Sequence, residues 1–232
     1  MLMTPTTGTN SNSCQPPGIV GGDRLQALFL VGSHCRSVRR NTPIYAPGDR
    51  AAQLFLVASG EVRISRYSND GRELVLELLG EGEVFGENGI LCDMPRMCQA
   101  TARKDTLLYV LEKEPLMSAL GADPALTLEF TRRMGERHAR MEDRLESLVF
   151  SSAQGKVAKV LLELAEDHGE ATQDGLLIQY PITHQEIGNL IATTRETVSY
   201  AFMEFRKAGL ISTHRRRTLV CDMPGLHAMA EM

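Results

Sequence analysis

The stretch "ITHQEIGNLIATTRETVSYAFMEFRKAGLIS", residues 182–212, has the apolar spacing of two short helices joined by a tight turn. Two apolar faces carry this spacing: Ile187, Leu190 and Ile191, followed by Val198, Phe202 and Phe205. The letters "ATT" between them break the periodicity, and Thr194 is placed to cap the second helix. The stretch therefore predicts a helix-turn-helix.

The first turn of the second predicted helix carries Arg195, Glu196 and Thr197. In a helix-turn-helix these positions enter the major groove of DNA. Arginine can bond to guanine O6 and N7 together, and glutamate can accept from cytosine N4. We expect DNA contacts from the two helices and a following wing: Thr183, His184, Gln185, Thr194, Arg195, Glu196, Thr197, Tyr200, Arg215, Arg216 and Arg217.

The letters "THRRRT", residues 213–218, lie between two short apolar runs and predict a β-hairpin wing whose arginines meet phosphates. Residues 182–220 contain six Lys or Arg and three Glu, whereas the formal net charge of the chain is −4. DNA contact must therefore come from a local patch. We expect that the protein is not an enzyme. The spacing of its His and Cys residues does not bring together a nucleophile, a base and a group that orients the base.

Short β-like runs fill the region from Cys35 to Val110, among them "LFLVASGEVRISRY" (54–67), "ELVLELL" (73–79) and "TLLYVL" (106–111). Glycines separate these runs, and Asp70–Gly71 is a hairpin signal between two of them. The spacing predicts an antiparallel β-roll, or jelly roll, in a chain of the α+β class.

After Glu114 the periodicity becomes helical, and one stripe recurs at alternating intervals of four and three: Thr127, Thr131, Met134, His138, Met141, Leu145 and Leu148. This is a heptad seam, and it predicts a long dimerisation helix in a homodimer. A single amphipathic helix on its own core would show the same stripe. Gln154 and Gly155 follow as the expected hinge. The predicted seam comprises Met134, His138, Met141, Leu145 and Leu148.

These patterns divide the chain into residues 1–22, a disordered segment; 23–121, the β-roll; 122–153, the dimerisation helix and hinge; and 154–232, the winged helix-turn-helix. The five cysteines are odd in number and scattered, which argues against a disulfide framework or a zinc site and favours a reducing cytoplasm. No apolar run approaches 18 residues, and the start of the chain lacks a secretory signal. We expect a cytoplasmic protein with no membrane partner.

Over roughly residues 25–222 the sequence resembles the superfamily of the cyclic-AMP receptor protein and the fumarate-nitrate regulator. "ITHQEIGNLIATTRETVS" (182–199) is similar to the recognition signature of that family, and "FGENGILCDMPRMCQATA" (85–102) to its phosphate-binding cassette. The resemblance implies an N-terminal β-roll effector domain, a long dimerisation helix and a C-terminal winged helix. It also implies RNA polymerase as a partner. Two recognition helices related by a twofold axis would bind a near-palindromic operator.

Within the cassette, Gly86 and Glu87 match the Gly-Glu pair whose carboxylate accepts from the ribose 2′-hydroxyl, and Asn88 follows them. Arg96 matches the arginine that pairs with the cyclic phosphate, for which a guanidinium offers a planar fork. The family usually has Ser or Thr after this arginine, where this chain has Met97.

On the long helix, Met141 and Glu142 stand where the best-known member of the family contacts the adenine amino group with Thr and Ser. Each lost contact would cost about 1–3 kcal/mol if its partner stayed buried and unsatisfied. The chain instead offers Arg137 and other arginines on this helix, with Arg103 at the end of the cassette strand. Arginines stack on purines and a carboxylate accepts from guanine, which would suit cyclic di-GMP. Cyclic AMP and cyclic di-GMP both stay open as effectors.

The recognition helix also departs from the family pattern. Tyr200 stands where a further arginine is common, so we expect a modified target sequence. Ala192 stands where the turn often has glycine, which would cost roughly 1 kcal/mol if the turn needs a left-handed residue.

Two other functions remain open. A haem or redox sensor is the first, since relatives of this fold bind iron. Cluster ligation needs four thiolates, which Cys14 and Cys35 do not supply, and a histidine at the heptad position of His138 is more typical of a register-setting polar group. We therefore expect no metal. A cyclic-nucleotide-binding regulator that acts on a protein is the second, and the winged helix argues against it.

Overall fold

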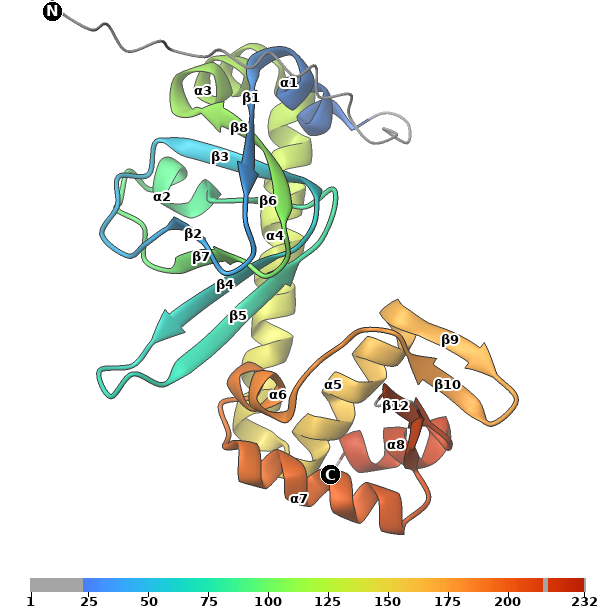
Figure 1. The fold of residues 1–232 in the computed structure, drawn as a ribbon. Coiled ribbons are helices and arrows are strands. Elements are labelled where there is room, and N and C mark those ends of the chain that lie inside the picture. The colour runs from blue at the N-terminus through green and yellow to red at the C-terminus, as the bar shows by residue number, and fades with distance from the viewer. Residues whose placement is uncertain (1–22, 215–216, 232) are drawn as a thin grey trace, which may run out of the picture. The chain divides into compact units, whose positions relative to one another are not determined.

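The computed structural model describes residues 23–214 and 217–231, which form two compact units (Figure 1). The first unit contains residues 23–62 and 79–129, and the second contains residues 63–78 and 130–231. The predicted disordered segment, 1–22, and two arginines of the predicted wing, Arg215 and Arg216, lie outside the described residues.

Antiparallel strands build the first unit. Its main sheet has the order β1-β8-β3-β6, from β1 (His34–Val38), β8 (Thr106–Glu112), β3 (Gln53–Ser59) and β6 (Val84–Phe85). The register places Cys35 opposite Tyr109 and Phe55 opposite Val110. Two further strands, β2 (Pro43–Tyr45) and β7 (Gln99–Ala102), pair with Pro43 opposite Thr101. Large side chains from β3, β6 and β8 are buried between these strands, as the apolar runs predicted.

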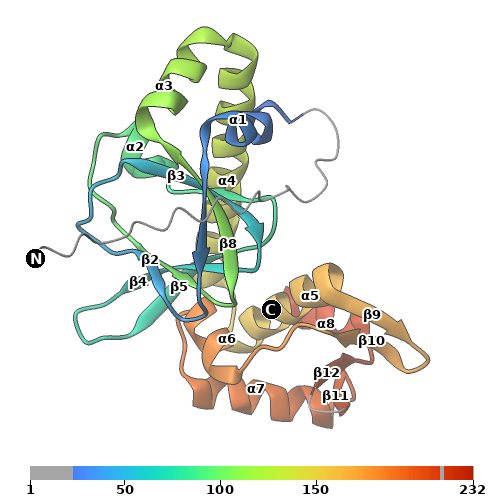
Figure 2. The same cartoon turned by 45° about the horizontal axis from the view of Figure 1, so that its top comes forward.

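Three helices complete this unit: α1 (Arg24–Gly32), α2 (Glu87–Leu91) and α3 (Lys113–Ala122). The side chain of Asp23 caps α1 by accepting from two backbone N–H groups, and Leu25 and Phe29 are fully buried beneath it. Helices α1 and α3 lie side by side at one end of the β1–β8 pair (Figures 1 and 2). The sequence periodicity did not predict α1.

The long helix α4 (Pro124–Phe150) begins at a proline after Asp123, whose carboxylate accepts from the backbone N–H of Ala125 at 2.9 Å. The part from Phe130 onward belongs to the second unit. That unit also holds most of a hairpin made by β4 (Val62–Tyr67) and β5 (Glu73–Leu79). The turn between these strands contains Asp70 and is closed at Gly71, whose backbone N–H donates to the carbonyl oxygen of Ser68 at 2.9 Å, so the predicted Asp70–Gly71 hairpin signal is confirmed. Within residues 23–214 and 217–231, no helix has the length and apolarity needed to cross a membrane.

The C-terminal part of the second unit starts with α5 (Ala153–His168). Its sheet has the order β11-β12-β10-β9, from β11 (Ile211–His214), β12 (Arg217–Val220), β10 (Gly175–Ile178) and β9 (Gly169–Thr172). Helices α6 (His184–Leu190), α7 (Arg195–Lys207) and α8 (Met223–Ala230) complete it. Leu161 of α5, Ile187 of α6, and Val198 and Phe205 of α7 share one buried core. The predicted helix-turn-helix with two wing strands is confirmed.

The prediction that Gln154 and Gly155 form the hinge is wrong. Helix α4 ends at Phe150, and the hydroxyl of Ser152 caps α5 by accepting from the backbone N–H of Gly155 at 3.0 Å. Because a serine at this position starts a helix, Gln154 and Gly155 lie in the first turn of α5. The break between the helices is at Ser151 and Ser152.

Candidate functional sites

Gly86 and Arg96 of the cassette meet inside the first unit. Gly86 has φ +92° and is the cap of α2, and a Cβ added there would lie 2.9 Å from Nη1 of Arg96. The absence of a side chain thus permits both the backbone conformation and the close approach of the guanidinium. Arg96 donates to the carbonyl oxygens of Gly86 and Gln53, and its guanidinium carbon lies 4.4 Å from the ring centre of Tyr45.

The environment of Arg96 is suited to an anion. Only 6% of the residue is exposed, and its Nε has no hydrogen-bond partner in the described part of the chain. Burial lowers the pKa of Arg96, while Tyr45, Glu87 and Asp49 oppose this shift. A buried charged donor without an acceptor is costly, and a phosphate oxygen would supply that acceptor. The residues present therefore fit a phosphate group.

The other cassette residues differ in their surroundings. Glu87 lies in the first turn of α2 and is 1% exposed, whereas Asn88 next to it is exposed. Met97 is 55% exposed and offers no hydrogen-bond donor from its side chain. The structure brings Gly86, Glu87 and Arg96 together, and it leaves the position of the usual second donor apolar.

Arg103 is engaged in an ion pair with the loop between β3 and β4. Its Nη1 lies 3.1 Å from Oε1 of Glu61, and Nζ of Lys104 lies 2.9 Å from Oε2 of the same carboxylate. The backbone N–H of Arg103 donates to the carbonyl of Glu61 at 2.8 Å. Because Glu61 is buried, this cluster holds two loops of the first unit together.

The effector residues predicted on α4 belong to the second unit. Arg137 donates from Nε to Oε1 of Glu77 on β5 at 2.7 Å, so its charge is already paired with the hairpin. Met141 and Glu142 are exposed. Glu142 lies 3.2 Å from the imidazole of His138, one helical turn earlier.

Arg144 of α4 is a residue that the sequence did not single out. Its guanidinium donates to the carbonyl oxygens of Val75 and Leu76 on β5 and to that of Leu190 at the end of α6. Burial lowers the pKa of Arg144, and Glu163 and Glu77 oppose the shift. The side chain of Asn189 adds a bond to Glu73, with Nδ2 to Oε2 at 2.9 Å. Within the second unit, the hairpin, α4 and α6 are therefore bonded to one another.

Capping positions both helices of the helix-turn-helix. Thr183 and Glu186 form a reciprocal capping box at the start of α6. Thr194 caps α7, with Oγ1 accepting from the backbone N–H of Thr197 at 3.2 Å, as predicted. Ala192 has φ +53°, so the turn does use the left-handed conformation that costs an alanine roughly 1 kcal/mol. Gln185 is exposed and bonds to Asn189 on the next turn.

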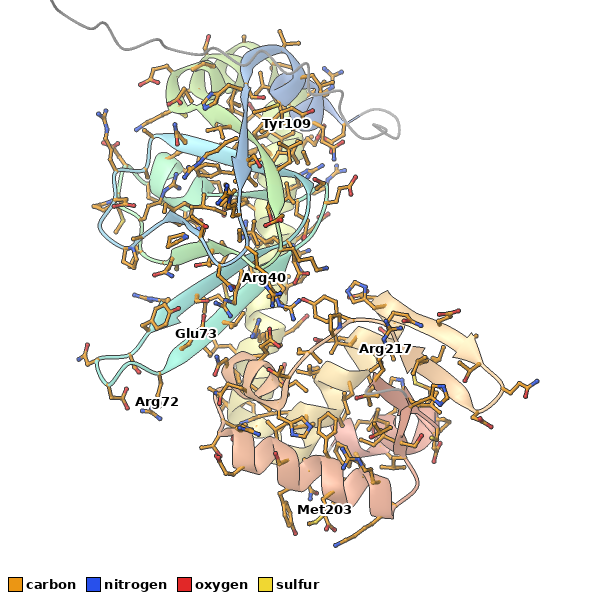
Figure 3. The ribbon with its side chains drawn as sticks, in the orientation of Figure 1. Arg40, Arg72, Glu73, Tyr109, Met203 and Arg217 are labelled. Atoms are coloured by element: carbon orange, nitrogen blue, oxygen red, sulfur yellow. The ribbon has the colours of Figure 1, made fainter. Side chains whose placement is uncertain are left out.

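One face of α7 is exposed while the opposite face is in the core. Arg195, Glu196 and Tyr200 are exposed, and Met203 projects away from the ribbon (Figure 3). Figures 1 and 2 both show α7 at the outside of its unit. Arg217 lies exposed at the start of β12, opposite His214. His184 is half-buried, with Nδ1 2.9 Å from Oγ of Ser199.

The predicted seam on α4 is partly exposed. Met141 and Leu145 are exposed, Met134 is half-buried, and the stripe continues at Val149, which the prediction did not include. Leu148 packs against the C-terminal core. The exposed apolar side chains of Met141, Leu145 and Val149 recur at intervals of four residues along one side of the helix.

Metal ligands are not clustered in the described residues. No group of three or more His, Cys, Asp or Glu that could hold a metal is found there. Cys35, Cys92, Cys98 and Cys221 form no disulfide in the same part of the chain, and Cys14 lies outside it.

Two family models match the chain: the cyclic nucleotide-binding domain over residues 35–123 and the Crp-like helix-turn-helix domain over residues 155–229. The chain is 31% identical, over 207 residues, to a protein of Mycobacterium tuberculosis named CRP-like cAMP-activated global transcriptional regulator, covering 88% of this chain and 92% of the relative. It is 34% identical over 169 residues to the cyclic AMP receptor protein of Thermus thermophilus, covering 73% and 75%.

Among solved structures, the fold is similar to that of CLP, the c-di-GMP-responsive global regulator of Xanthomonas campestris. The TM-score is 0.75 at 24% identity, over 84% of this chain and 97% of that one. This likeness concerns the fold alone. The two family models, and the Mycobacterium tuberculosis relative that matches nearly the full length, agree with the cassette and the helix-turn-helix described above. The chain therefore belongs to the CRP/FNR superfamily of transcription regulators.

Proposed function

We propose that the protein is a homodimeric DNA-binding regulator whose affinity for its operator is controlled by a cyclic nucleotide bound at Arg96. The observation that carries this proposal is the guanidinium of Arg96, which is buried beside Gly86 and Glu87 and whose Nε has no acceptor among the residues that the structure describes. A regulator with this function is not an enzyme. The effector domain, dimerisation helix and winged helix would occupy residues 23–121, 122–153 and 154–232.

Cyclic AMP is the first candidate effector, because a relative at 31% identity is named as cAMP-activated. The phosphate would bind Arg96 and the ribose would bind Glu87. Cyclic di-GMP is the second candidate, because Met97 supplies no phosphate donor and Met141 and Glu142 offer no hydroxyl to an adenine. Arg137 would have to leave Glu77 in order to stack on a guanine.

On the DNA side, the first turn of α7 would enter the major groove. Arg195 would bond to guanine and Glu196 would accept from cytosine, while Arg217 of the wing would meet a phosphate. Tyr200 has a phenol in place of a guanidinium, so at its position it would favour a thymine methyl or a phosphate. Two such domains in a dimer would bind a near-palindrome.

Coupling between the effector and the DNA requires that the nucleotide bind one state of the dimer better than the other. The bonds from Arg144 and Asn189 to β5 support such coupling, because they join α6 to the hairpin of the second unit. A change in the hairpin would then be passed to the helix-turn-helix. We place the protein in the cytoplasm with RNA polymerase as a partner.

Isothermal titration with a panel of cyclic mono- and dinucleotides tests the proposal. Wild-type protein is expected to bind one of them, and Arg96→Ala to lose that binding while it stays dimeric by sedimentation. Arg40→Ala is the control, because Arg40 is an exposed arginine of the same unit outside the cassette (Figure 3). An unchanged titration of Arg96→Ala, or no binding by the wild type, would contradict the proposal.

A further inference from the structure

His184, the first residue of α6, is held against α7 by two contacts. Its Nδ1 lies 2.9 Å from Oγ of Ser199, and its ring centre lies 4.3 Å from that of Phe202. Ser199 in turn donates from Oγ to the carbonyl oxygen of Arg195 at 2.9 Å. A chain of two hydrogen bonds therefore connects His184 to the backbone of the residue that begins the recognition helix.

Both hydrogen bonds of Ser199 can form together only if the imidazole of His184 carries its proton on Nδ1. A serine hydroxyl has one hydrogen, and here it is donated to Arg195. The bond between Ser199 and His184 must then be donated by Nδ1–H of the imidazole. In a neutral ring with the proton on Nδ1, Nε2 has a lone pair and is the only place for a second proton.

In the free protein, the surroundings of His184 disfavour protonation of Nε2. Burial lowers the pKa of His184, and the positive charges of Arg206 and Arg195 on α7 lower it further. On its own helix the acidic neighbour is Glu186, whose carboxylate accepts from the backbone N–H of Thr183 in the capping box. Near neutral pH the imidazole is therefore uncharged.

We propose that His184 takes up a proton at Nε2 when the helix-turn-helix binds DNA, and that it acts through Ser199 as a positioning residue for Arg195. The inference rests on the proposed DNA-binding function. Double-stranded DNA carries about one negative charge for each 1.7 Å of its axis, and a nearby opposite charge favours the protonated form. The new Nε2–H can donate to a phosphate, while Nδ1–H keeps its bond to Ser199.

The direction of the resulting pH dependence follows from linkage. If the pKa of His184 is higher in the complex than in the free protein, the complex binds more protons and affinity rises as the pH falls. The effect begins at the pKa in the complex and saturates below the pKa in the free protein. Kd then falls about tenfold for each unit by which DNA raises the pKa.

Fluorescence anisotropy tests this with the full chain and a DNA fragment selected from a genomic library by gel shift. Titrations at constant ionic strength span about pH 5.5–8.5, where an imidazole changes charge. In His184→Asn the amide N–H can replace Nδ1–H as donor to Ser199 but cannot be protonated. Whatever its affinity at high pH, the Kd of this variant should no longer vary with pH. In His214→Asn, which removes an exposed histidine of β11, the pH dependence should persist.

Ser199→Ala provides the readout for positioning. It breaks the link to Arg195, so discrimination at the base pair contacted by Arg195 should fall while general affinity changes less. A Kd independent of pH in the wild type, full pH dependence in His184→Asn, or unaltered discrimination in Ser199→Ala would overturn the inference. Nuclear magnetic resonance of the His184 ring tests the inference without a variant. The pKa of His184 must be higher in the complex with DNA than in the free protein. If the wild type binds no fragment at any pH, the proposed function itself fails.

Discussion

Replacing Gly86 by alanine should destabilise the cassette in two separable ways. Gly86 has φ +92°, and an L-residue held in the left-handed region costs roughly 1–2 kcal/mol. The new Cβ would also lie 2.9 Å from Nη1 of Arg96 and 3.2 Å from the carbonyl oxygen of Gln53. Arg96, which is only 6% exposed, must then move within its packed surroundings.

The steric part can be estimated from the bonds that Arg96 makes. The guanidinium donates to the carbonyl oxygens of Gly86 and Gln53, and a bond to a charged group contributes about 1.5–3 kcal/mol. If the displacement breaks one of them, Gly86→Ala should lower the free energy of unfolding by about 2.5–5 kcal/mol in total. Its nucleotide response should be lost as well.

Gly48 provides the matched control. It has φ +90° in the same unit, and nothing lies within 4 Å of a Cβ added there. Gly48→Ala should therefore cost only the backbone strain, about 1–2 kcal/mol. The free energy of unfolding of both variants is measured by equilibrium unfolding in urea, monitored by far-ultraviolet circular dichroism. The two variants must show equal m-values for their free energies to be compared. Equal losses in the two variants would refute the inference that Gly86 makes room for Arg96.

Three further predictions concern the second unit. Thr194→Ala removes the cap of α7 and should lower the free energy of unfolding by about 1 kcal/mol. Calorimetry should find Tm lower by roughly 2–4 °C, and an unchanged Tm would contradict the capping role. Arg195→Ala should lose about 1–3 kcal/mol of discrimination at one base pair in binding assays on operator variants, whereas an equal loss on every sequence would mean a backbone contact only. Leu145→Glu should separate the dimer in sedimentation without loss of helicity, because this side chain is 58% exposed; a persistent dimer would place the interface elsewhere.

Features that depend on residues close in sequence were predictable. The turn that contains Asp70 and Gly71 and the cap at Thr194 both follow from the chemistry of a few neighbouring positions. The predicted hinge differs from the observed break because Gly155 by itself suggests an interruption of the helix, although it lies in the first turn of α5. The serine cap at 152 instead begins the helix before it.

Features that depend on distant partners were not predictable. The sequence predicts Arg103 as an effector contact but not its ion pair, because the carboxylate partner, Glu61, lies 42 positions away in the sequence. Arg137 pairs with Glu77 at a separation of 60, and Arg144 bonds to Val75 at a separation of 69. No local pattern distinguishes such an arginine from one on an exposed helix surface, because the burial that fixes its role arises only when the strands pack.

The most direct test of nucleotide control measures Kd for the selected DNA fragment with and without cyclic AMP or cyclic di-GMP, in wild type and Arg96→Ala. We predict that one of the two nucleotides changes the Kd of the wild type by about tenfold or more, within the usual range of allosteric coupling. The same nucleotide should leave the Kd of Arg96→Ala unchanged. A wild-type Kd that neither nucleotide alters, or an equal change in the variant, would contradict the account.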